Sequence, residues 1–274
     1  MTPFEPFDEP HPVIGMVHLP ALPGAPGHDS SRASIRERAV AAATALLEGG
    51  VDGILVENFG DAPFYPASVP THVVADLTAI TATVVESVDV PVGVNVLRND
   101  AEAAVSVAAA AGATFVRVNV HVGAAVTDQG LLEGRAHETM RLRERIDAPV
   151  AVFADVHVKH ASPLGTATVE QAARDATDRG LADGIVVSGP STGSTTSVGT
   201  VERVSAALES GGESTPVIVG SGVTPATVAS LTGAGADGFI VGTALKQDGR
   251  VDGPISVERV SRLVDARDTV DARE

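Results

Sequence analysis

The sequence predicts a single-domain (β/α)8 barrel, the TIM-barrel fold of the α/β class. Three observations lead to this fold: short apolar runs alternate with longer Ala-rich amphipathic stretches, eight such runs occur, and no Gly-x-Gly-x-x-Gly turn follows the first run. The chain has 274 residues, of which 44% are hydrophobic, and this is enough for one barrel with a large core. A doubly wound open sheet with the same local alternation is the alternative fold.

The expected strands are short runs rich in Val and Ile, bounded by turn residues. They cover residues 13–18, 53–57, 90–97, 114–119, 149–157, 184–188, 216–220 and 238–242. Seven segments between them are long enough for crossover connections, and residues 32–48 and 100–111 have the clearest helical pattern. The last crossover, at residues 225–232, is the shortest, and an eighth helix is expected at residues 257–265.

A short repeat precedes three of the expected strands. Gly follows a helix, and Val-Asp-Gly or Ala-Asp-Gly then leads into an apolar run, as in GGVDGILVEN, GLADGIVVSG and GAGADGFIVG. Gly after a helix adopts the left-handed conformation that caps it. The repeat recurs at about the length of one βα unit, which a barrel would show.

No domain boundary interrupts the pattern. We expect an N-terminal arm at residues 1–12, the barrel at 13–267 and a C-terminal tail at 268–274. Aromatic residues make up only 3% of the chain, so the core is expected to consist mainly of Val, Ile, Leu and Ala.

The chain is strongly acidic, with a formal net charge of −16, and its only lysines are Lys159 and Lys246. Acid excess with few lysines is typical of halophilic proteins, because salt screens the self-repulsion of an acidic surface. The alternative explanation is a GC-rich genome, in which arginine codons replace lysine codons. Such a surface repels phosphate groups of nucleic acids and of anionic lipids, so no nucleic-acid partner is expected.

Several classes of protein are excluded or disfavoured by simple absences in the sequence. The chain has no cysteine, which excludes disulfides, thiolate nucleophiles and Cys-ligated zinc. Its first residues lack the basic region and apolar run of a signal peptide, and no segment has the apolar length of a spanning helix. We therefore expect a cytoplasmic protein that does not insert into membranes.

The strongest local signal for a ligand lies near the end of the chain. VIVGSGVTPATVASL predicts a strand, a Gly-Ser-Gly turn and a short helix with Thr224 as its N-cap and Pro225 as its first residue, and a helix N-terminus favours an anion. The next strand ends in GFIVGTALK, and many barrels bind phosphate with the loops after strands seven and eight. The alternative is that these glycines only permit tight turns. The predicted phosphate-binding residues are Gly220, Ser221, Gly222, Gly242, Thr243 and Lys246.

Polar residues end the other expected strands. Side chains alternate along a strand, so Asp155, His157 and Lys159 are predicted to share one face at the end of strand five. Burying such groups is costly without a purpose, and we predict that these three and Glu57 are catalytic. The alternative for single residues is a buried ion pair, such as Arg117 with Glu57 or Asp155. The predicted substrate-binding residues are His18, Asn58, Asn95, Arg98, Arg117, Asn119, His121 and Ser188.

Three chemistries fit these residues. His157 or Asp155 can act as a general acid or base beside a phosphorylated substrate. Lys159 can form a Schiff base, which an arginine cannot, because the guanidinium is never neutral. In the third alternative, a divalent metal is held by Glu57, Asp155 and His157. Acid/base chemistry is favoured, with the Schiff base next and the metal last.

The sequence resembles the BtpA family from about residue 13 to residue 262. The specific matches are VIGMVHLPALPGAP, DGILVENFGDAPF and ADVHVKHA, with further matches in VGVNVLRND, FVRVNVHVGA, DGIVVSGPSTG, VIVGSGV and DGFIVGTALKQDG. The resemblance implies a TIM-barrel-like fold. It also implies a role in the biogenesis of a membrane complex, photosystem I, after which cyanobacterial members are named.

Two functions remain open from the sequence. The favoured one is an enzyme acting on a small phosphorylated metabolite, such as a sugar phosphate or a nucleotide-derived compound, by lyase, aldolase, isomerase or hydrolase chemistry. The alternative is a non-catalytic biogenesis factor that stabilises a membrane protein complex, with the loops after strands one, two and six as its contact surface. A homo-oligomer is left open.

Overall fold

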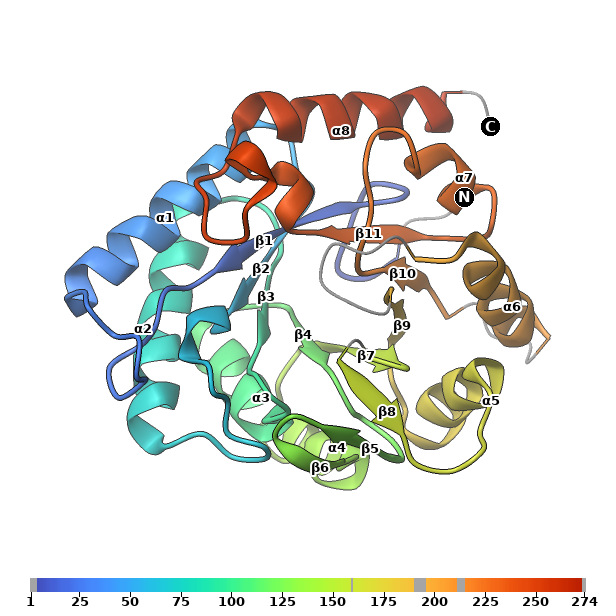
Figure 1. Ribbon diagram of the computed structural model, residues 1–274, viewed down its shortest axis with the longest axis horizontal. Coiled ribbons are helices and arrows are strands. Elements are labelled where there is room, and N and C mark those ends of the chain that lie inside the picture. Colours follow the sequence, from blue (N-terminus) through green and yellow to red (C-terminus); the bar gives the residue numbers. More distant parts are fainter. Residues whose placement is uncertain (1–3, 159, 190–195, 211–214, 273–274) are drawn as a thin grey trace.

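A computed structural model describes residues 4–158, 160–189, 196–210 and 215–272, and in it eight parallel strands close into a barrel (Figure 1). The closed order β1-β11-β10-β9-β7-β4-β3-β2 confirms the predicted barrel and rules out the open sheet. Each strand lies within a few residues of its predicted position. The barrel strands are β1 (Val13–His18), β2 (Gly53–Glu57), β3 (Val92–Asn95), β4 (Phe115–Val118), β7 (Ala151–Val156), β9 (Gly184–Val187), β10 (Val217–Val219) and β11 (Gly238–Val241).

Helices cover the outside of the barrel. Local caps begin several of them: the Ser31 hydroxyl accepts the Ser34 N–H before α1, and the Asp100 carboxylate accepts the Ala103 N–H before α3. None of the helices in the described ranges is long and apolar enough to cross a membrane. The helices are α1 (Arg32–Glu48), α2 (Thr71–Ser87), α3 (Ala101–Ala111), α4 (Ala136–Arg145), α5 (Val169–Arg174), α6 (Val198–Glu209), α7 (Val228–Thr232) and α8 (Val257–Asp271).

Two helices differ from their predicted bounds. Helix α8 continues to Asp271, past the expected start of the tail at residue 268. Helix α7 begins at Val228, so Thr224 is not its N-cap and Pro225 is not its first residue. Residues 224–227 form a turn instead, in which the Thr224 N–H donates to the Thr227 hydroxyl over 2.9 Å.

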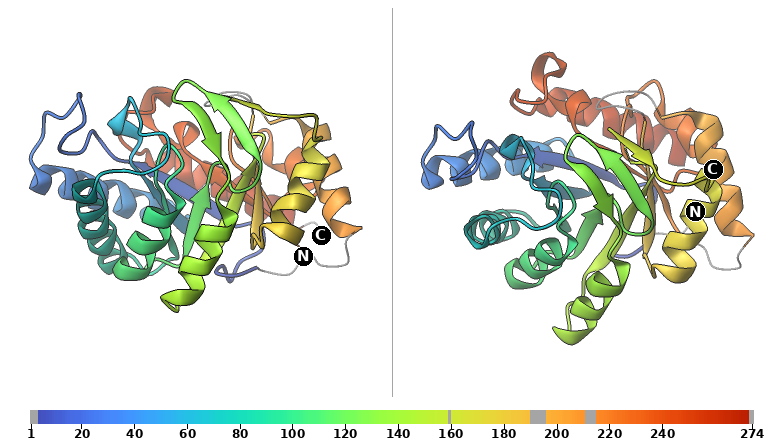
Figure 2. Two further views of the ribbon diagram at one scale, coloured as in Figure 1. Left: turned by 90° about the horizontal axis from the view of Figure 1, so that it is seen from below. Right: turned by 60° about the horizontal axis from the view of Figure 1, so that its bottom comes forward.

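A small antiparallel sheet, which the sequence pattern did not predict, lies beyond the barrel. Strands β5 (Ala124–Thr127) and β6 (Gly130–Glu133) form a hairpin, and β8 (Ala161–Pro163) pairs with β5. The sheet follows β4 and β7 and lies on the same side of the barrel as the loops after β1 and β2 (Figure 2). Its strands have three or four residues each, which is too short for a periodic signal.

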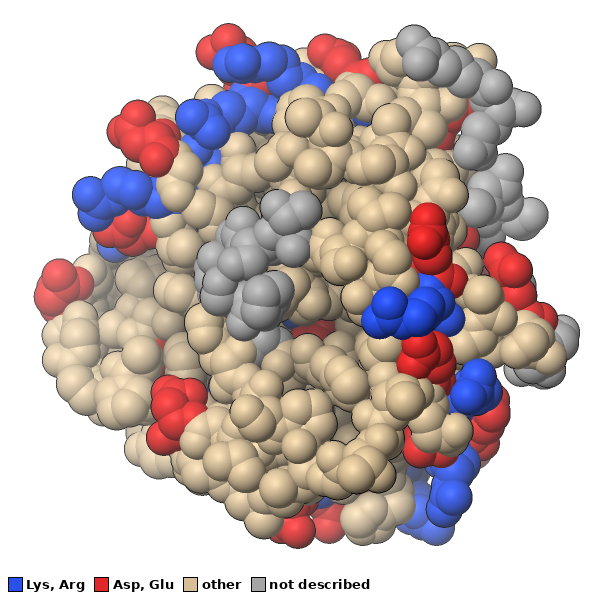
Figure 3. Space-filling view, turned by 45° about the vertical axis from the view of Figure 1, so that its right-hand side comes forward, with Lys and Arg blue, Asp and Glu red and all other residues tan. Residues whose placement is uncertain are grey.

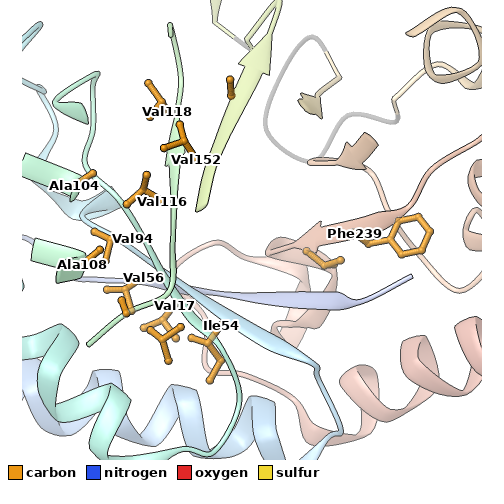
Figure 4. Close-up of a cluster of buried hydrophobic side chains, with 14 of the residues drawn as sticks. Val17, Ile54, Val56, Val94, Ala104, Ala108, Val116, Val118, Val152 and Phe239 are labelled. Atoms are coloured by element: carbon orange, nitrogen blue, oxygen red, sulfur yellow. The ribbon is translucent and has the colours of Figure 1, made fainter. Parts of the chain in front are cut away.

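The apolar core has two layers. Side chains between the barrel and the helices are mostly Val, Ile, Leu and Ala, as predicted, and Figure 4 shows part of this layer, including Val56, Val116 and Ala104. The inside of the barrel also contains phenylalanine, because Phe115 and Phe153 pack there with their ring centres 5.3 Å apart. Phe7 of the N-terminal arm packs on both rings, so the arm closes the amino-terminal end of the barrel.

The Asp-Gly repeat has a structural explanation at this same end. Asp52, Asp183 and Asp237 each accept the N–H of a residue in a neighbouring strand, at 2.7–2.8 Å. The glycine after Asp52 leaves room for the arm, since a Cβ at Gly53 would lie 2.6 Å from the Phe7 ring. The repeat therefore joins adjacent strands at the amino-terminal end of the barrel, opposite the strand ends that carry polar residues.

Candidate active site

At the carboxyl end of the barrel, the last inward-facing residues of the eight strands form a ring. Leu55, Phe115 and Phe153 point into the barrel. Because side chains alternate along a strand, the residues two positions further along also point inward. The ring is uneven, because β1, β2, β3, β4 and β7 contribute large polar side chains, whereas β9, β10 and β11 contribute small ones. Its members are His18, Glu57, Asn95, Arg117, Asp155, Ser188, Gly220 and Gly242.

A buried ion pair lies at the end of the polar half that is formed by β4 and β7. Arg117 is fully buried and donates two hydrogen bonds to Asp155, from Nε over 2.9 Å and from Nη2 over 3.0 Å. Burial opposes the charge of Arg117, but the charge and hydrogen bonds of Asp155 raise the pKa of the guanidinium above its ordinary value. The ion pair between Arg117 and Asp155 that the sequence left as an alternative is thus present.

Two further side chains complete this cluster. Asn119 donates from Nδ2 to Asp155 over 2.9 Å, and the Ser188 hydroxyl accepts a weaker hydrogen bond of 3.3 Å from Arg117. The Asn119 Oδ1 atom is buried and has no hydrogen-bond partner among the described residues. Since a buried acceptor without a partner is costly, this atom is available to a ligand.

A second polar group lies on β1, β2 and β3. Glu57 is 5% exposed, and its Oε2 accepts a hydrogen bond of 2.8 Å from Asn95. Its Oε1 lies 3.7 Å from Nε2 of His18, whose ring contacts Phe59 with 5.0 Å between ring centres. An imidazole beside a carboxylate that is oriented by an amide is a suitable pair for proton transfer.

The small half of the ring borders a cavity of about 240 Å³. The loops after β10 and β11 form its walls through Gly220, Ser221, Gly222, Gly242 and Thr243, so five predicted phosphate-binding residues line one cavity. Arg117, His18, Met16 and Ile240 also line this cavity. The predicted helix N-terminus does not form this site, because α7 starts only at Val228.

The two ring glycines keep the cavity open. A Cβ at Gly242 would lie 2.8 Å from Cε1 of His18, and a Cβ at Gly220 would lie 2.8 Å from a Val186 methyl and 2.9 Å from the Ser188 hydroxyl. Neither glycine has a positive φ. Glycine is therefore required here for space and not for the backbone conformation.

Two histidines are not where the alternation predicted them. Strand β7 ends at Val156, and His157 is exposed with a φ of 49°, so it does not continue the inward face of Asp155. Strand β4 ends at Val118, and the Nε2 atom of His121 lies 2.8 Å from the Gly180 carbonyl oxygen, near the end of α5. Burial lowers the pKa of His121. The alternation holds only as far as the strand does.

Three other predicted residues have different surroundings from those expected. Lys246 lines a separate cavity and does not line the one that contains Ser221 and Thr243. Both ends of the Asn58 amide are used within the protein, since Oδ1 accepts the Leu97 N–H over 2.7 Å and Nδ2 donates to Asp61 over 3.0 Å.

Arg98 is 5% exposed, and burial lowers its pKa against the opposing charges of Asp155 and Glu57. Lys159, the predicted Schiff-base residue, lies outside the described residues.

The sequence pattern missed Met16 and Thr224, which also line the 240 Å³ cavity. Met16 lies two residues before His18, so alternation along β1 contains the signal for it. No group of three or more His, Asp or Glu side chains in the described part of the chain is arranged to hold a metal ion. The predicted set of Glu57, Asp155 and His157 is thus not assembled as metal ligands.

A protein-family model, that of the BtpA family, matches residues 9–269. Over 263 residues the chain is 45% identical to the Photosystem I biogenesis protein BtpA of Synechocystis, covering 96% of this chain and 90% of the relative. It is 47% identical over 254 residues to an uncharacterized protein of Thermococcus kodakarensis, covering 93% of this chain and 94% of that one.

Solved structures with the same fold are more distant in sequence. The thiamine phosphate pyrophosphorylase of Pyrococcus furiosus is 13% identical with a TM-score of 0.57, over 94% of this chain and 95% of that one. The phosphoribosyl anthranilate isomerase of Thermus thermophilus is 12% identical with a TM-score of 0.54, over 94% and 99%. At these identities the likeness concerns the barrel fold alone.

Proposed function

The chain belongs to the BtpA family, and from that premise we propose that it is an enzyme acting on a small phosphorylated metabolite. The phosphate occupies the cavity between the loops after β10 and β11. The observation that carries this proposal is the uneven ring: small residues leave space on one side, and the buried Arg117 lines that space. A guanidinium together with a glycine-rich backbone is a suitable combination for a phosphate group.

The reacting end of the substrate points from this cavity toward the polar half of the ring. There, His18 and Glu57 form the acid/base pair. His18 lines the cavity, and Oε1 of Glu57 lies 3.7 Å from Nε2 of His18. Asp155 accepts hydrogen bonds from Arg117 and Asn119, so we assign it a role in positioning these two side chains. The metabolite class remains a sugar phosphate or nucleotide-derived compound, and Lys159 stays the candidate for Schiff-base chemistry.

Ligand-induced stabilisation tests the phosphate site. Inorganic phosphate and ribose 5-phosphate are expected to raise the Tm of the wild-type chain, because a ligand that binds only the native state stabilises it. Gly242→Ala places a methyl group against His18 and should weaken phosphate binding about tenfold or more, which corresponds to ~1.4 kcal/mol.

Gly27→Ala is the matched control, since a Cβ there meets only Ala21 at 3.6 Å and lies away from the ring. It should keep the full shift in Tm. Equal phosphate binding by the Gly242→Ala and Gly27→Ala chains would contradict the proposal. His18→Gln and Glu57→Gln should retain phosphate binding and lose turnover of any phosphorylated compound that the wild type converts.

A second candidate function is a biogenesis factor for a membrane protein complex, which the name of the Synechocystis relative favours. Val126 and Leu131 face each other across the β5–β6 hairpin and are about half exposed, and Leu164 beyond β8 is also exposed. Paired apolar side chains on an edge hairpin suit a protein partner. Under this function, Val126→Ser with Leu131→Ser abolishes co-purification with the complex while phosphate binding is unchanged.

We assign the protein to the cytoplasm of an organism with high internal salt, on the basis of its net charge of −16. On the face in Figure 3, Asp and Glu side chains lie beside Lys and Arg side chains at the upper left and on the right. If the acidic surface is an adaptation to salt, adding KCl raises the Tm. A Tm that is independent of KCl would contradict this assignment.

A further inference from the structure

A second and larger cavity lies beside the barrel mouth, between α1 and the loop that joins β11 to α8. Its volume is about 760 Å³, roughly three times that of the phosphate cavity. Figure 1 shows this loop next to α1, above β1. Much of the lining is apolar, including Ala42 and Ala45 of α1, Val251 and Ile255 of the loop, and Phe59. The proposed function uses none of these residues.

Lys246 lines this cavity and is only 5% exposed. Its backbone is held in place, since it forms an antiparallel bridge with Ile255 and its N–H donates to the Thr243 carbonyl oxygen over 3.2 Å. Its ammonium group makes no hydrogen bond or ion pair with any other described residue. An amine at the wall of a cavity, with no counter-ion in contact, is available to a ligand that enters the cavity.

The charges around Lys246 do not supply a counter-ion in contact with it. Among the acidic residues, Asp252 has the largest electrostatic effect on Lys246. Both of its carboxylate oxygens, however, accept hydrogen bonds from Arg250, at 3.1 Å and 2.8 Å. Burial lowers the pKa of Lys246 to about 8, and the positive charge of Arg38 acts in the same direction. About a tenth of the amine is therefore neutral and nucleophilic at pH 7, which is far more than for a lysine with an ordinary pKa.

We propose that this cavity is a second ligand site, which takes an aldehyde or ketone with an apolar body and joins it to Lys246 as an imine. The apolar walls accommodate the body of the ligand, and Nζ attacks the carbonyl carbon. A C–N bond forms as the C=O π bond breaks, and one proton moves from nitrogen to oxygen. Loss of water then gives the C=N bond. We assign the exchange of this proton to His18, because it lines both cavities.

The small number of lysines makes the test direct. The full chain is treated with benzaldehyde and sodium cyanoborohydride at pH 7 to 9, and the benzylated residues are identified by peptide mass mapping. The only side-chain amines are Lys159 and Lys246. Lys246 is expected to react about tenfold faster than Lys159 at pH 7, with a rate that reaches half its maximum near pH 8, because its pKa is lowered.

Lys246→Arg should abolish this fast benzylation, whereas Lys159→Arg should leave it unchanged. Equal rates at the two lysines, or a Lys246 rate that still rises steeply above pH 9, would overturn the proposal. Lys246→Arg should also keep the phosphate-dependent rise in Tm, so a failure at this site is distinguishable from a failure of the proposed phosphate site.

A variant that retains Lys246 separates cavity binding from simple amine reactivity. Ala42→Leu narrows the cavity and should reduce benzylation of Lys246 at least about threefold at low benzaldehyde concentration. Ala110→Leu on the exposed side of α3 is the matched control and should react as the wild type does. If both variants react at the wild-type rate, the cavity does not bind the aldehyde and the proposal is wrong.

Discussion

The two ends of the barrel each contain a buried arginine–aspartate pair. At the carboxyl end, Arg117 and Asp155 are joined at 2.9 and 3.0 Å; at the amino end, Arg267 and Asp52 are joined at 2.7 and 3.4 Å. Both arginine side chains are less than 10% exposed. The chemistry is the same, so any difference in role must come from the surroundings.

The amino-terminal pair is satisfied from within the protein. Asp52 also accepts the Val13 N–H, and Arg267 also donates to Asp268 and to the His11 carbonyl oxygen, so α8 is tied to β1 and β2. In the carboxyl-terminal pair, Arg117 instead lines the 240 Å³ cavity, and Asp155 accepts a hydrogen bond from Asn119, whose Oδ1 has no partner among the described residues. One pair therefore closes the barrel, whereas the other retains hydrogen-bonding capacity for a ligand.

The largest expected effect is at the ligand-facing pair. Asp155→Ala leaves Arg117 buried without its counter-ion, and the free energy of unfolding should fall by about 3–5 kcal/mol. Urea denaturation measures this loss. Asp155→Asn is the milder companion, because its amide oxygen can still accept a hydrogen bond from Arg117. A loss below about 1 kcal/mol in Asp155→Ala would mean that Arg117 finds another partner.

Disrupting the amino-terminal pair of Arg267 and Asp52 should lower the free energy of unfolding by less, and without loss of ligand binding. Asp52→Ala removes the partner of the Val13 N–H and of Arg267, but Arg267 keeps Asp268, so about 2–3 kcal/mol of stability should be lost. The phosphate-dependent shift in Tm should persist. If Asp52→Ala loses phosphate binding while it remains folded, the division of roles between the two ends is wrong.

The smallest effect concerns Asp237. Like Asp52, it accepts a backbone N–H from a neighbouring strand, but in the part of the chain that the structure describes it has no arginine partner like the Arg267 of Asp52. Burial raises the pKa of Asp237 above its unfolded value, so its contribution to stability is present at low pH and is lost as the pH rises through the raised pKa. Asp237→Asn does not titrate and should gain stability relative to the wild type as the pH rises through this range.

Thermal unfolding of both chains at pH 3.5 and pH 7 measures this difference. Comparing the two chains at each pH removes the common effect of the other carboxylates. The prediction fails if the Tm of Asp237→Asn does not rise relative to that of the wild type between pH 3.5 and pH 7. Burial would then not destabilise the Asp237 carboxylate.

Much of the fold could be read from the sequence because its signals are local. Each barrel strand is a short apolar run after a turn, and the Asp-Gly repeat marks the start of β2, β9 and β11. The antiparallel sheet could not be read in this way. Strand β5 pairs with its hairpin partner β6 and also with β8, where Thr127 faces Ala161 from a distant part of the sequence. Nothing in strands of three or four residues encodes that second pairing.

For the site, alternation along the strands was sufficient to direct Glu57, Arg117 and Asp155 into the barrel. It also brought together the two glycine loops, since the ends of parallel strands meet at one face. Alternation could not assign His157, because its φ of 49° turns the chain after β7. Nor could it assign Lys246, whose backbone pairs with Ile255 in the next loop.

Strand patterns therefore specified which side chains face inward, since that property repeats every two residues within one segment. Tertiary structure decided which of them pair, which stay available, and which cavity each one borders. Those outcomes depend on contacts between segments far apart in the chain, such as Arg117 with Asp155 and His18 with Gly242, and on the space that each contact leaves.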